Sequence, residues 1–232
     1  MKYLLLLLAI VLISFYSCTP ANNAGRNITK KEIKDWSDNQ KLKLVKEQAA
    51  LWLADWKCED CTEHSRTVAL KFFSDERLNV VETALMEELQ YDIPAEVKIA
   101  QAIVETGWGR HVKGNNWFGI KGNGQIITTK EYLSSHEMSS YNIVHSTKVK
   151  EDLYLCVVKD SFSSYATSWE SWRAHSLYLV NRKIGDKYLY KELQGKEWET
   201  WCNELADRGY ATDIAYGSKL RNIIEKYKLY TL

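Results

Sequence analysis

The chain has 232 residues, which is enough for one sizeable domain with or without an extension. Hydrophobic residues make up 45% of it and charged residues 26%, as in an ordinary globular protein. The net charge of +1 excludes the strongly basic footprint of proteins that bind duplex nucleic acid, so we expect no nucleic-acid partner.

The N-terminus predicts export. A basic start is followed by an apolar run from Tyr3 to Tyr16, which is shorter than the roughly 20 residues of a membrane-spanning helix. A small residue, Ser17, ends the run, as in signal peptides. Ser17-Cys18 also resembles the lipobox of bacterial lipoproteins, whose cysteine is acylated after cleavage. We therefore expect a signal peptide over residues 1–17 and a lipid anchor on Cys18. An uncleaved membrane anchor is the alternative, and both place the folded part outside the cytoplasm, in the periplasm or cell envelope.

Three further segments complete the predicted organisation. Residues 18–40 are polar and contain proline, asparagine and glycine, which indicates a tether. Apolar residues then recur at helical spacing over 41–56 and predict an amphipathic helix. We treat 41–70 as a helical extension and 71–232 as the main domain. Whether the extension packs on that domain or binds a partner is left open.

The cysteines predict disulfides. Those that remain after Cys18 are Cys58, Cys61, Cys156 and Cys202. An even number in an oxidising compartment allows three pairings, and Cys58 with Cys61 would form a local bridge. Half a zinc site with His64 is the alternative, but no second ligand cluster lies nearby in the sequence. A redox CxxC motif lacks its strand–helix context. We expect no metal and no cofactor.

The main domain predicts mostly helices around a small group of strands. We expect helices over about 76–90, from Pro94 to Gly107, over 168–181 (opened by Ser168), over 196–207 and over 213–228. Residues 125–133 and 153–158 are rich in β-branched side chains and predict strands, joined by a long loop or a further strand. Together these elements predict an α+β, mainly α, fold.

Glu105 is the first candidate for chemistry. It stands in the last turn of its predicted helix, where the negative end of the helix dipole disfavours a second negative charge. Apolar neighbours such as Ile103 and Trp108 disfavour ionisation further. A carboxyl with a raised pKa is suited to general acid catalysis. Taken alone, an ordinary solvated helix glutamate is the more common case.

Four sequence blocks, which follow one another between about residues 95 and 229, favour the catalytic interpretation of Glu105. They read Ile99-Ala-Gln-Ala-Ile-Val-Glu-Thr-Gly-Trp-Gly109, Asn115-Asn-Trp-Phe-Gly-Ile-Lys121, Tyr165-Ala-Thr-Ser-Trp-Glu-Ser-Trp-Arg-Ala-His175 and Gly209-Tyr-Ala-Thr-Asp213, the last followed by Tyr216 and Lys219-Leu220. This set resembles the signature of glycoside hydrolase family 73, the bacterial peptidoglycan glucosaminidases. The departures are Thr106 for Ser, Trp117 for Leu, Ala174 for Asp and Ile214 for Pro.

The resemblance implies a lysozyme-like fold, in which a helical lobe and a small β-lobe flank a substrate cleft. It implies that 71–232 is a catalytic domain that hydrolyses the β-1,4 bond after N-acetylglucosamine in peptidoglycan glycan strands, with Glu105 as general acid. It does not cover the segment before about residue 70. The alternatives are a non-catalytic cell-wall binding module, or a lytic transglycosylase or muramidase on the same fold.

The second carboxylate is expected in the β-lobe. Relatives carry it in a strand with the pattern T-T-E-Y, which Thr128-Thr-Lys-Glu-Tyr132 matches with one inserted lysine, so Glu131 is the candidate. By alternation Glu131 shares a strand face with Thr129 and Leu133. An edge-strand glutamate facing water is the alternative. Glu137 in the following loop is a second candidate base, and without a second acid the substrate's own acetamido group would act.

The remaining site candidates each carry two interpretations. The resemblance places Tyr210 in the cleft, where it would orient the substrate; otherwise it is a packed aromatic. Asp213 binds substrate or caps the last helix. Asn116 bonds an acetamido group or holds a turn. The aromatic residues Trp108, Trp117 and Phe118 serve as sugar platforms or as core. We expect a monomer whose partners are glycan strands and, through Cys18, a membrane.

Overall fold

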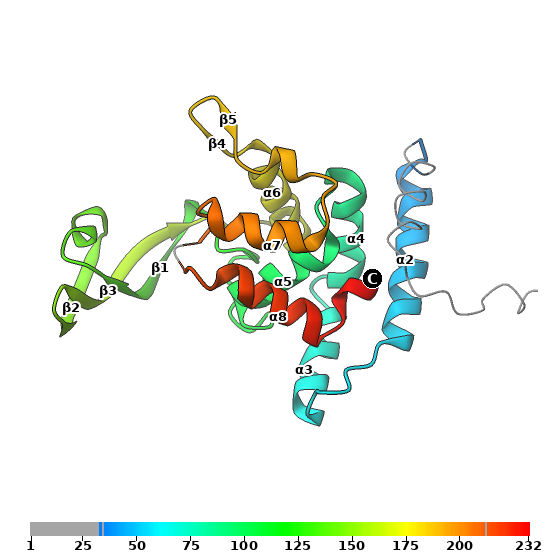
Figure 1. Ribbon diagram of the computed structural model, residues 1–232, viewed down its shortest axis with the longest axis horizontal. Helices are drawn as coiled ribbons and strands as arrows, with labels where there is room; N and C mark the ends of the chain where they lie inside the picture. The colour runs from blue at the N-terminus through cyan, green and yellow to red at the C-terminus, as the bar shows by residue number, and fades with distance from the viewer. Residues whose placement is uncertain (1–32, 34, 212) are drawn as a thin grey trace, which may run out of the picture. The chain divides into compact units, whose positions relative to one another are not determined.

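The computed structural model describes residue 33, residues 35–211 and residues 213–232. The signal peptide predicted for 1–17, Cys18 and most of the tether lie outside the described residues. The chain divides into two units, Met1–Lys41 and Leu42–Leu232. The second unit is mainly helical with a small sheet, so the α+β, mainly α, prediction is confirmed (Figure 1). In the described part of the chain, no helix has the length and apolar character that crossing a bilayer needs.

Seven α-helices are described. They are α2 (Asp38–Asp55), α3 (Glu63–Phe73), α4 (Val80–Tyr91), α5 (Ala95–Thr106), α6 (Ser168–Asn181), α7 (Trp198–Asp207) and α8 (Tyr216–Lys226). Short 3-10 turns follow at η1 (Glu137–Ser140), η2 (Lys191–Leu193) and η3 (Leu229–Thr231). Helix α3 was not predicted, and α4 begins four residues later than expected because Asn79 accepts a hydrogen bond from the amide of Glu82 and caps it. Thr167, rather than Ser168, caps α6.

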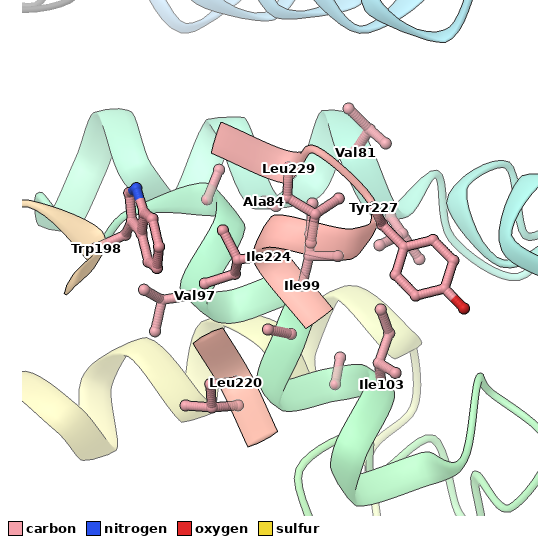
Figure 2. Close-up of a cluster of buried hydrophobic side chains, with 14 of the residues drawn as sticks. Val81, Ala84, Val97, Ile99, Ile103, Trp198, Leu220, Ile224, Tyr227 and Leu229 are labelled. Carbon is pink, nitrogen blue, oxygen red and sulfur yellow. The ribbon is translucent and has the colours of Figure 1, made fainter. Parts of the chain in front are cut away.

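Helix α5 is the centre of the core. Every residue from Ala95 to Ile103 is buried, as expected for a helix that is covered on all sides. Figure 2 shows Val97, Ile99 and Ile103 of α5 among Leu220 and Ile224 of α8, with side chains of α4 nearby. The helix ends as predicted, because Gly107 adopts the left-handed conformation that terminates helices (φ 56°). The last turn of α5 is therefore fixed by packing.

The predicted helical extension shares this core from residue 42 onward. Trp52 of α2 donates its indole N–H to Thr231 (2.9 Å), and Trp56 donates to the carbonyl of Tyr227 (2.7 Å). Cys58 and Cys61 form the local disulfide that was one of the predicted options. Cys156 and Cys202 are both free and buried, so the expected second bridge does not form.

The strands form one antiparallel sheet of order β1-β3-β2, from β1 (Lys121–Leu133), β2 (Ile143–Lys150) and β3 (Leu153–Phe162). The two predicted strands are confirmed, and the segment between them supplies both η1 and β2. The sheet extends to one side of the helices (Figure 1). A short hairpin that was not predicted, β4 (Lys183–Ile184) with β5 (Lys187–Tyr188), follows α6.

Candidate active site

Glu105 lies at the end of the buried helix α5, yet the residue itself is exposed to solvent. Burial against neighbouring protein atoms raises the pKa of its carboxyl, and a hydrogen bond from Tyr216 opposes this rise. A group that is both crowded by protein and open to solvent can exchange a proton with a bound molecule. The predicted rise in the pKa of Glu105 therefore has a physical cause in the structure.

Tyr216 holds the Glu105 carboxylate. It is the first residue of α8 and is buried, and its hydroxyl donates to Oε1 of Glu105 over 2.9 Å. The side chain of Gln101, one turn before Glu105 on α5, donates to the same hydroxyl over 3.3 Å. Tyr216 was not among the predicted site residues. Its position three residues after the Gly-Tyr-Ala-Thr-Asp block is the signal that could have identified it.

Tyr210 lies beside this pair. Its ring centroid is 5.3 Å from that of Tyr216, and its hydroxyl is hydrogen-bonded to Nε2 of His175 at 2.9 Å. Burial and the charge of Glu105 raise the pKa of Tyr210 well above its usual range, so the phenol keeps its proton. The structure thus brings Tyr210 and Glu105 into one cluster.

A buried polar layer lies behind Tyr210. The ring of His175 is fully buried and stacks on Phe118, with centroids 3.8 Å apart and planes within 2°. Among the described residues, Nδ1 of His175 has no hydrogen-bond partner. Lys98 of α5 is also fully buried and donates to Ser176 (2.5 Å) and to the carbonyl of Trp172 (2.9 Å). Burial lowers the pKa of Lys98 to about 7 and, together with the charge of Lys98, lowers that of His175 well below its usual range.

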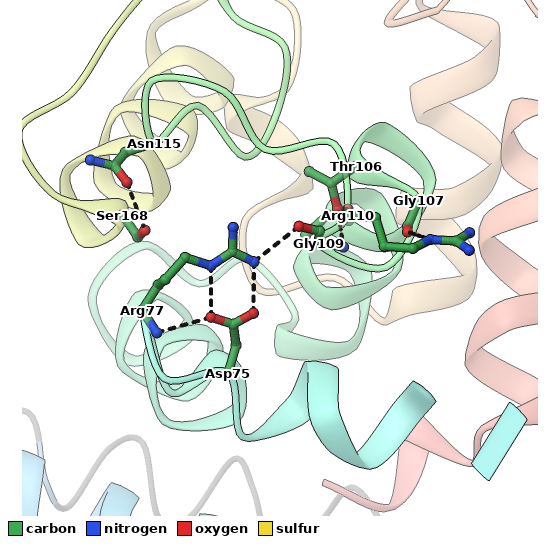
Figure 3. Close-up of polar contacts among 9 residues, drawn as sticks. Asp75, Arg77, Thr106, Gly107, Gly109, Arg110, Asn115 and Ser168 are labelled. Carbon is green, nitrogen blue, oxygen red and sulfur yellow. Dashed lines mark hydrogen bonds and ion pairs between the residues drawn. The ribbon is translucent and has the colours of Figure 1, made fainter. Parts of the chain in front are cut away.

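The turn after Glu105 is fixed by hydrogen bonds (Figure 3). The Thr106 hydroxyl donates to the carbonyl of Ala102 (2.5 Å) and accepts from the amide of Gly109 (2.8 Å). Arg77 donates to the carbonyl of Gly109 (2.9 Å) and is itself held by the carboxylate of Asp75. Since Ser and Thr both supply this hydroxyl, the departure from the family pattern at Thr106 keeps the contact.

The Asn-Asn-Trp-Phe-Gly loop runs beside Glu105. Gly119 has a left-handed φ of 61°, and a Cβ atom placed on it would lie 3.9 Å from Oε2 of Glu105. The amide of Asn116 donates to the carbonyls of Ile120 (2.9 Å) and Ser163 (3.0 Å), and its oxygen accepts from the amide of Ile120 (3.1 Å). These contacts place Asn116 in the turn that joins the sheet to the helices.

The three candidate aromatic residues differ in how deeply they are buried. Trp117 and Phe118 are buried in the helical core, and Trp117 packs on Phe72 of α3 at 6.0 Å. Trp108 is partly exposed and packs edge-on against Tyr227, with centroids 4.7 Å apart. Of the three, only Trp108 keeps surface that a sugar ring can reach without a rearrangement of the core.

The two candidates for the second carboxylate lie on different elements, Glu131 on β1 and Glu137 on η1. Glu131 is exposed on β1, opposite Cys156 of β3, and its charge adds to the effect of Asp160 in raising the pKa of Lys121. Lys121 pairs with Asp160 at 2.6 Å. The carboxylate of Glu137 accepts from the amide and the hydroxyl of Ser134, both at 2.8 Å. Glu131 is therefore the freer of the two candidates.

Asp213 lies on the turn that enters α8. Its carboxylate accepts from the amide of Ala215 (2.9 Å) and pairs with Lys219 (2.6 Å). The helix cap is Ala215, two residues later than the predicted Asp213. Asp213 thus supports the start of the helix that carries Tyr216. The described residues contain no group of three His, Cys, Asp or Glu side chains that could hold a metal ion.

Chemically, this arrangement supplies a carboxyl with a raised pKa at an accessible point, two phenols beside it, and a glycine-lined backbone next to its second oxygen. Such a set can protonate an oxygen atom of a neutral, hydroxyl-rich ligand. That is the first requirement of glycosidic bond cleavage.

Comparison with known proteins agrees with this geometry. The family model described as "Mannosyl-glycoprotein endo-beta-N-acetylglucosaminidase" matches residues 81–229. Exo-glucosaminidase LytG of Bacillus subtilis is 32% identical over 144 residues, covering 60% of this chain and 46% of that protein. An autolysin of Enterococcus faecalis is 32% identical over 154 residues, covering 60% of this chain and 18% of its own length. The chain therefore matches less than half of each of these curated relatives.

A solved structure supports the fold. The catalytic domain of the autolysin Auto from Listeria monocytogenes superposes with a TM-score of 0.52 at 25% identity, over 79% of this chain and 94% of that domain. The share of this chain that the superposition covers, 79%, is larger than the region matched by the family model.

Proposed function

Since the chain belongs to the glucosaminidase family, we propose that it hydrolyses the β-1,4 bond after N-acetylglucosamine in peptidoglycan glycan strands. The single observation that carries the proposal is Glu105, which is accessible, has a raised pKa and is bonded to Tyr216. The two relatives, an exo-glucosaminidase and an autolysin, support glycan of the cell wall as the substrate class.

In this proposal Glu105 is the general acid. It gives its proton to the glycosidic oxygen as the bond from that oxygen to C1 of N-acetylglucosamine breaks. The new carboxylate is then stabilised by the hydrogen bond from Tyr216, which strengthens as negative charge develops. Tyr210, kept protonated, contacts the sugar beside the bond and orients it. Gly119 leaves room for the substrate next to Oε2 of Glu105, and Trp108 offers a partly exposed ring.

Glu131 is the proposed second carboxylate. It is exposed on the β1 face that also carries Leu133, and it would take a proton from a water molecule that attacks C1. A wide gap between Glu105 and Glu131 would leave room for this water and imply inversion of the anomeric centre. Glu137 is the alternative base. Attack by the acetamido group of the substrate is the alternative mechanism, in which neither Glu131 nor Glu137 is needed as a base.

We also propose that the protein is exported and held at a membrane through Cys18, so that it faces the periplasm or cell envelope as a monomer. The apolar run before Cys18 supports this. In this arrangement residues 18–40 give the catalytic unit reach toward the cell wall, and 71–232 is the catalytic domain.

Digestion of purified sacculi tests the proposed reaction. The products are separated and their new ends identified by mass spectrometry. We expect reducing N-acetylglucosamine ends. Reducing muramic acid ends would instead identify a muramidase, and anhydro-muramic ends a lytic transglycosylase. Binding to sacculi without release of fragments would identify a non-catalytic wall-binding module. Each of these three results contradicts the proposal.

A further inference from the structure

A pocket lies where the β4–β5 hairpin meets η2 and the end of α7. Its volume is about 630 Å³, and its lining residues are Lys187, Tyr188, Leu189, Lys191, Glu192 and Arg208. The volume falls within the range of roughly 300–1,000 Å³ that is common for ligand sites. None of these residues has a part in the reaction proposed above.

The pocket is lined by three basic residues and one acidic residue. Arg208 pairs with both Glu192 and Glu204 at 2.5 Å, and it also donates to the carbonyl of Leu189. Its charge is therefore used to hold η2 against α7. Lys187 and Lys191 are exposed, and neither has a carboxylate partner within 4.0 Å among the described residues. These two ammonium groups are available to an anionic ligand.

The apolar part of the pocket is formed by Tyr188 and Leu189. The ammonium group of Lys191 lies 4.6 Å from the centre of the Tyr188 ring, so the ring sits directly beside one of the two available charges. A ligand that combines carboxylates with short aliphatic groups matches both parts, since the lysines bind the carboxylates and the ring and Leu189 cover the aliphatic groups. A bare inorganic anion would leave the apolar wall unused.

The pocket adjoins the candidate active site on the side of Tyr210. Leu189 is followed by Tyr190, whose ring centroid is 6.3 Å from that of Tyr210. The Tyr210 ring is in turn 5.3 Å from Tyr216, which bonds to Glu105. Arg208 precedes Tyr210 by two residues. These ring contacts connect the residues next to the pocket with Tyr216, which holds Glu105.

We propose that this pocket binds the acidic stem peptide of peptidoglycan. The inference rests on the proposed function, because the peptide hangs from the muramic acid residue next to the bond that Glu105 would cleave. Its free carboxylates pair with Lys187 and Lys191, and its small alanine-type side chains pack on Tyr188 and Leu189. The pocket would thus favour strands that carry peptides over bare glycan.

The test compares two substrates and two double variants. The substrates are glycan strands with their stem peptides and the same strands after an amidase has removed the peptides. The first variant is Lys187→Ala/Lys191→Ala. The matched control is Lys46→Ala/Lys196→Ala, which removes the same charge from exposed lysines outside the pocket. None of these four residues belongs to the proposed catalytic machinery.

We expect the pocket variant to raise KM on peptide-bearing strands by about threefold to tenfold, the scale of two solvent-exposed charge pairs. The same variant should digest peptide-free strands at the wild-type rate, and the control variant should match wild type on both. If the pocket variant raises KM equally on both substrates, or raises it on neither, the proposal is overturned. Wild-type protein that cleaves neither substrate would instead refute the proposed function.

Direct binding gives a readout that does not depend on turnover. Calorimetry with the Glu105→Gln protein would use a synthetic stem tetrapeptide and its fully amidated form as probes. We expect the acidic tetrapeptide to bind more tightly than the amidated one, and the difference to vanish in the Lys187→Ala/Lys191→Ala background. If the variant loses binding to vesicles of anionic phospholipid while tetrapeptide binding is unchanged, the pocket is a membrane contact and the proposal fails.

Discussion

The hydroxyl of Tyr216 donates to Oε1 of Glu105 across 2.9 Å and joins the first residue of α8 to the last turn of α5. These two residues are 111 positions apart in the chain. The contact therefore depends on the packing of α5 against α8, and it couples the proton affinity of Glu105 to the core of the domain.

Tyr216→Phe should move the alkaline limit of activity to higher pH. The hydrogen bond favours the ionised carboxylate, so its loss raises the pKa of Glu105 further. A general acid works only while protonated, and kcat/KM therefore falls at a higher pH in the variant. The measurement is the pH profile of kcat/KM on glycan strands. An alkaline limb that stays in place or moves to lower pH would show that Tyr216 does not control Glu105.

His175 and Tyr210 should behave as one unit in a double-mutant cycle. Their hydrogen bond of 2.9 Å fixes the phenol beside Glu105, so His175→Phe should lower kcat by about as much as Tyr210→Phe. The double variant should then show little further loss, because residues that act through one contact are not additive. Additive losses in kcat, accompanied by a fall in Tm, would mean that His175 serves only the stability of the core.

Lys98→Met should stabilise the protein most below neutral pH. The folded-state pKa of Lys98 is lowered to about 7, chiefly by burial. The charge of Glu87 raises this pKa and the charge of Arg173 lowers it. His175, which lies nearby, stays neutral because its own pKa is lowered. The unfolded chain keeps this proton up to about pH 10.4. Above that pH Lys98 is neutral in both states, so its burial carries no charge penalty. As pH falls toward 7, only the unfolded chain readily takes up the proton, and the folded state loses stability.

Thermal unfolding at pH 6 and pH 9 tests this sign. The Tm of the wild type should be lower at pH 6 than at pH 9, and this difference in Tm should be smaller in Lys98→Met. The matched control is Lys196→Met, which changes an exposed lysine and should leave the pH dependence as in wild type. A Lys98→Met protein that is less stable than wild type at pH 6 would show that the hydrogen bonds of Lys98 outweigh the cost of its buried charge.

Glu131 and Glu137 give opposite expectations. Glu131→Gln should lower kcat by about 10²-fold or more, the scale of a general base, while Glu137→Gln should leave kcat near wild type. Initial rates on glycan strands at fixed pH measure both. If neither substitution slows the reaction, the acetamido group of the substrate is the better candidate nucleophile. If only Glu137→Gln does so, the assignment of the base moves to Glu137.

Local patterns predicted the elements well where one face is plainly apolar or a cap is explicit. The helix that carries Glu105 was bounded correctly because Gly107 ends it in a left-handed conformation. Helix α3 escaped prediction because its polar residues obscure the small buried face of Ala69, Phe72 and Phe73. The β4–β5 hairpin has two residues in each strand, too few for an alternating pattern.

Within the candidate site, the sequence motifs pointed to Glu105 and Tyr210 but not to the residues that hold them. The partners Tyr216 and His175 reach the cluster from α8 and α6, and only the packed fold places them there. The burial of Trp117 and Phe118 likewise depends on tertiary packing. A motif alone does not separate an aromatic residue that meets a sugar from one that fills the core.

Activity of Glu105→Gln tests the central claim most directly. Glutamine keeps the size of the side chain and an acceptor for Tyr216 but has no acidic proton to transfer, so we expect release of fragments from sacculi to fall by at least about 10²-fold. Tm should remain close to that of wild type. Turnover near the wild-type rate in a folded Glu105→Gln protein would contradict the assignment of Glu105 as the general acid.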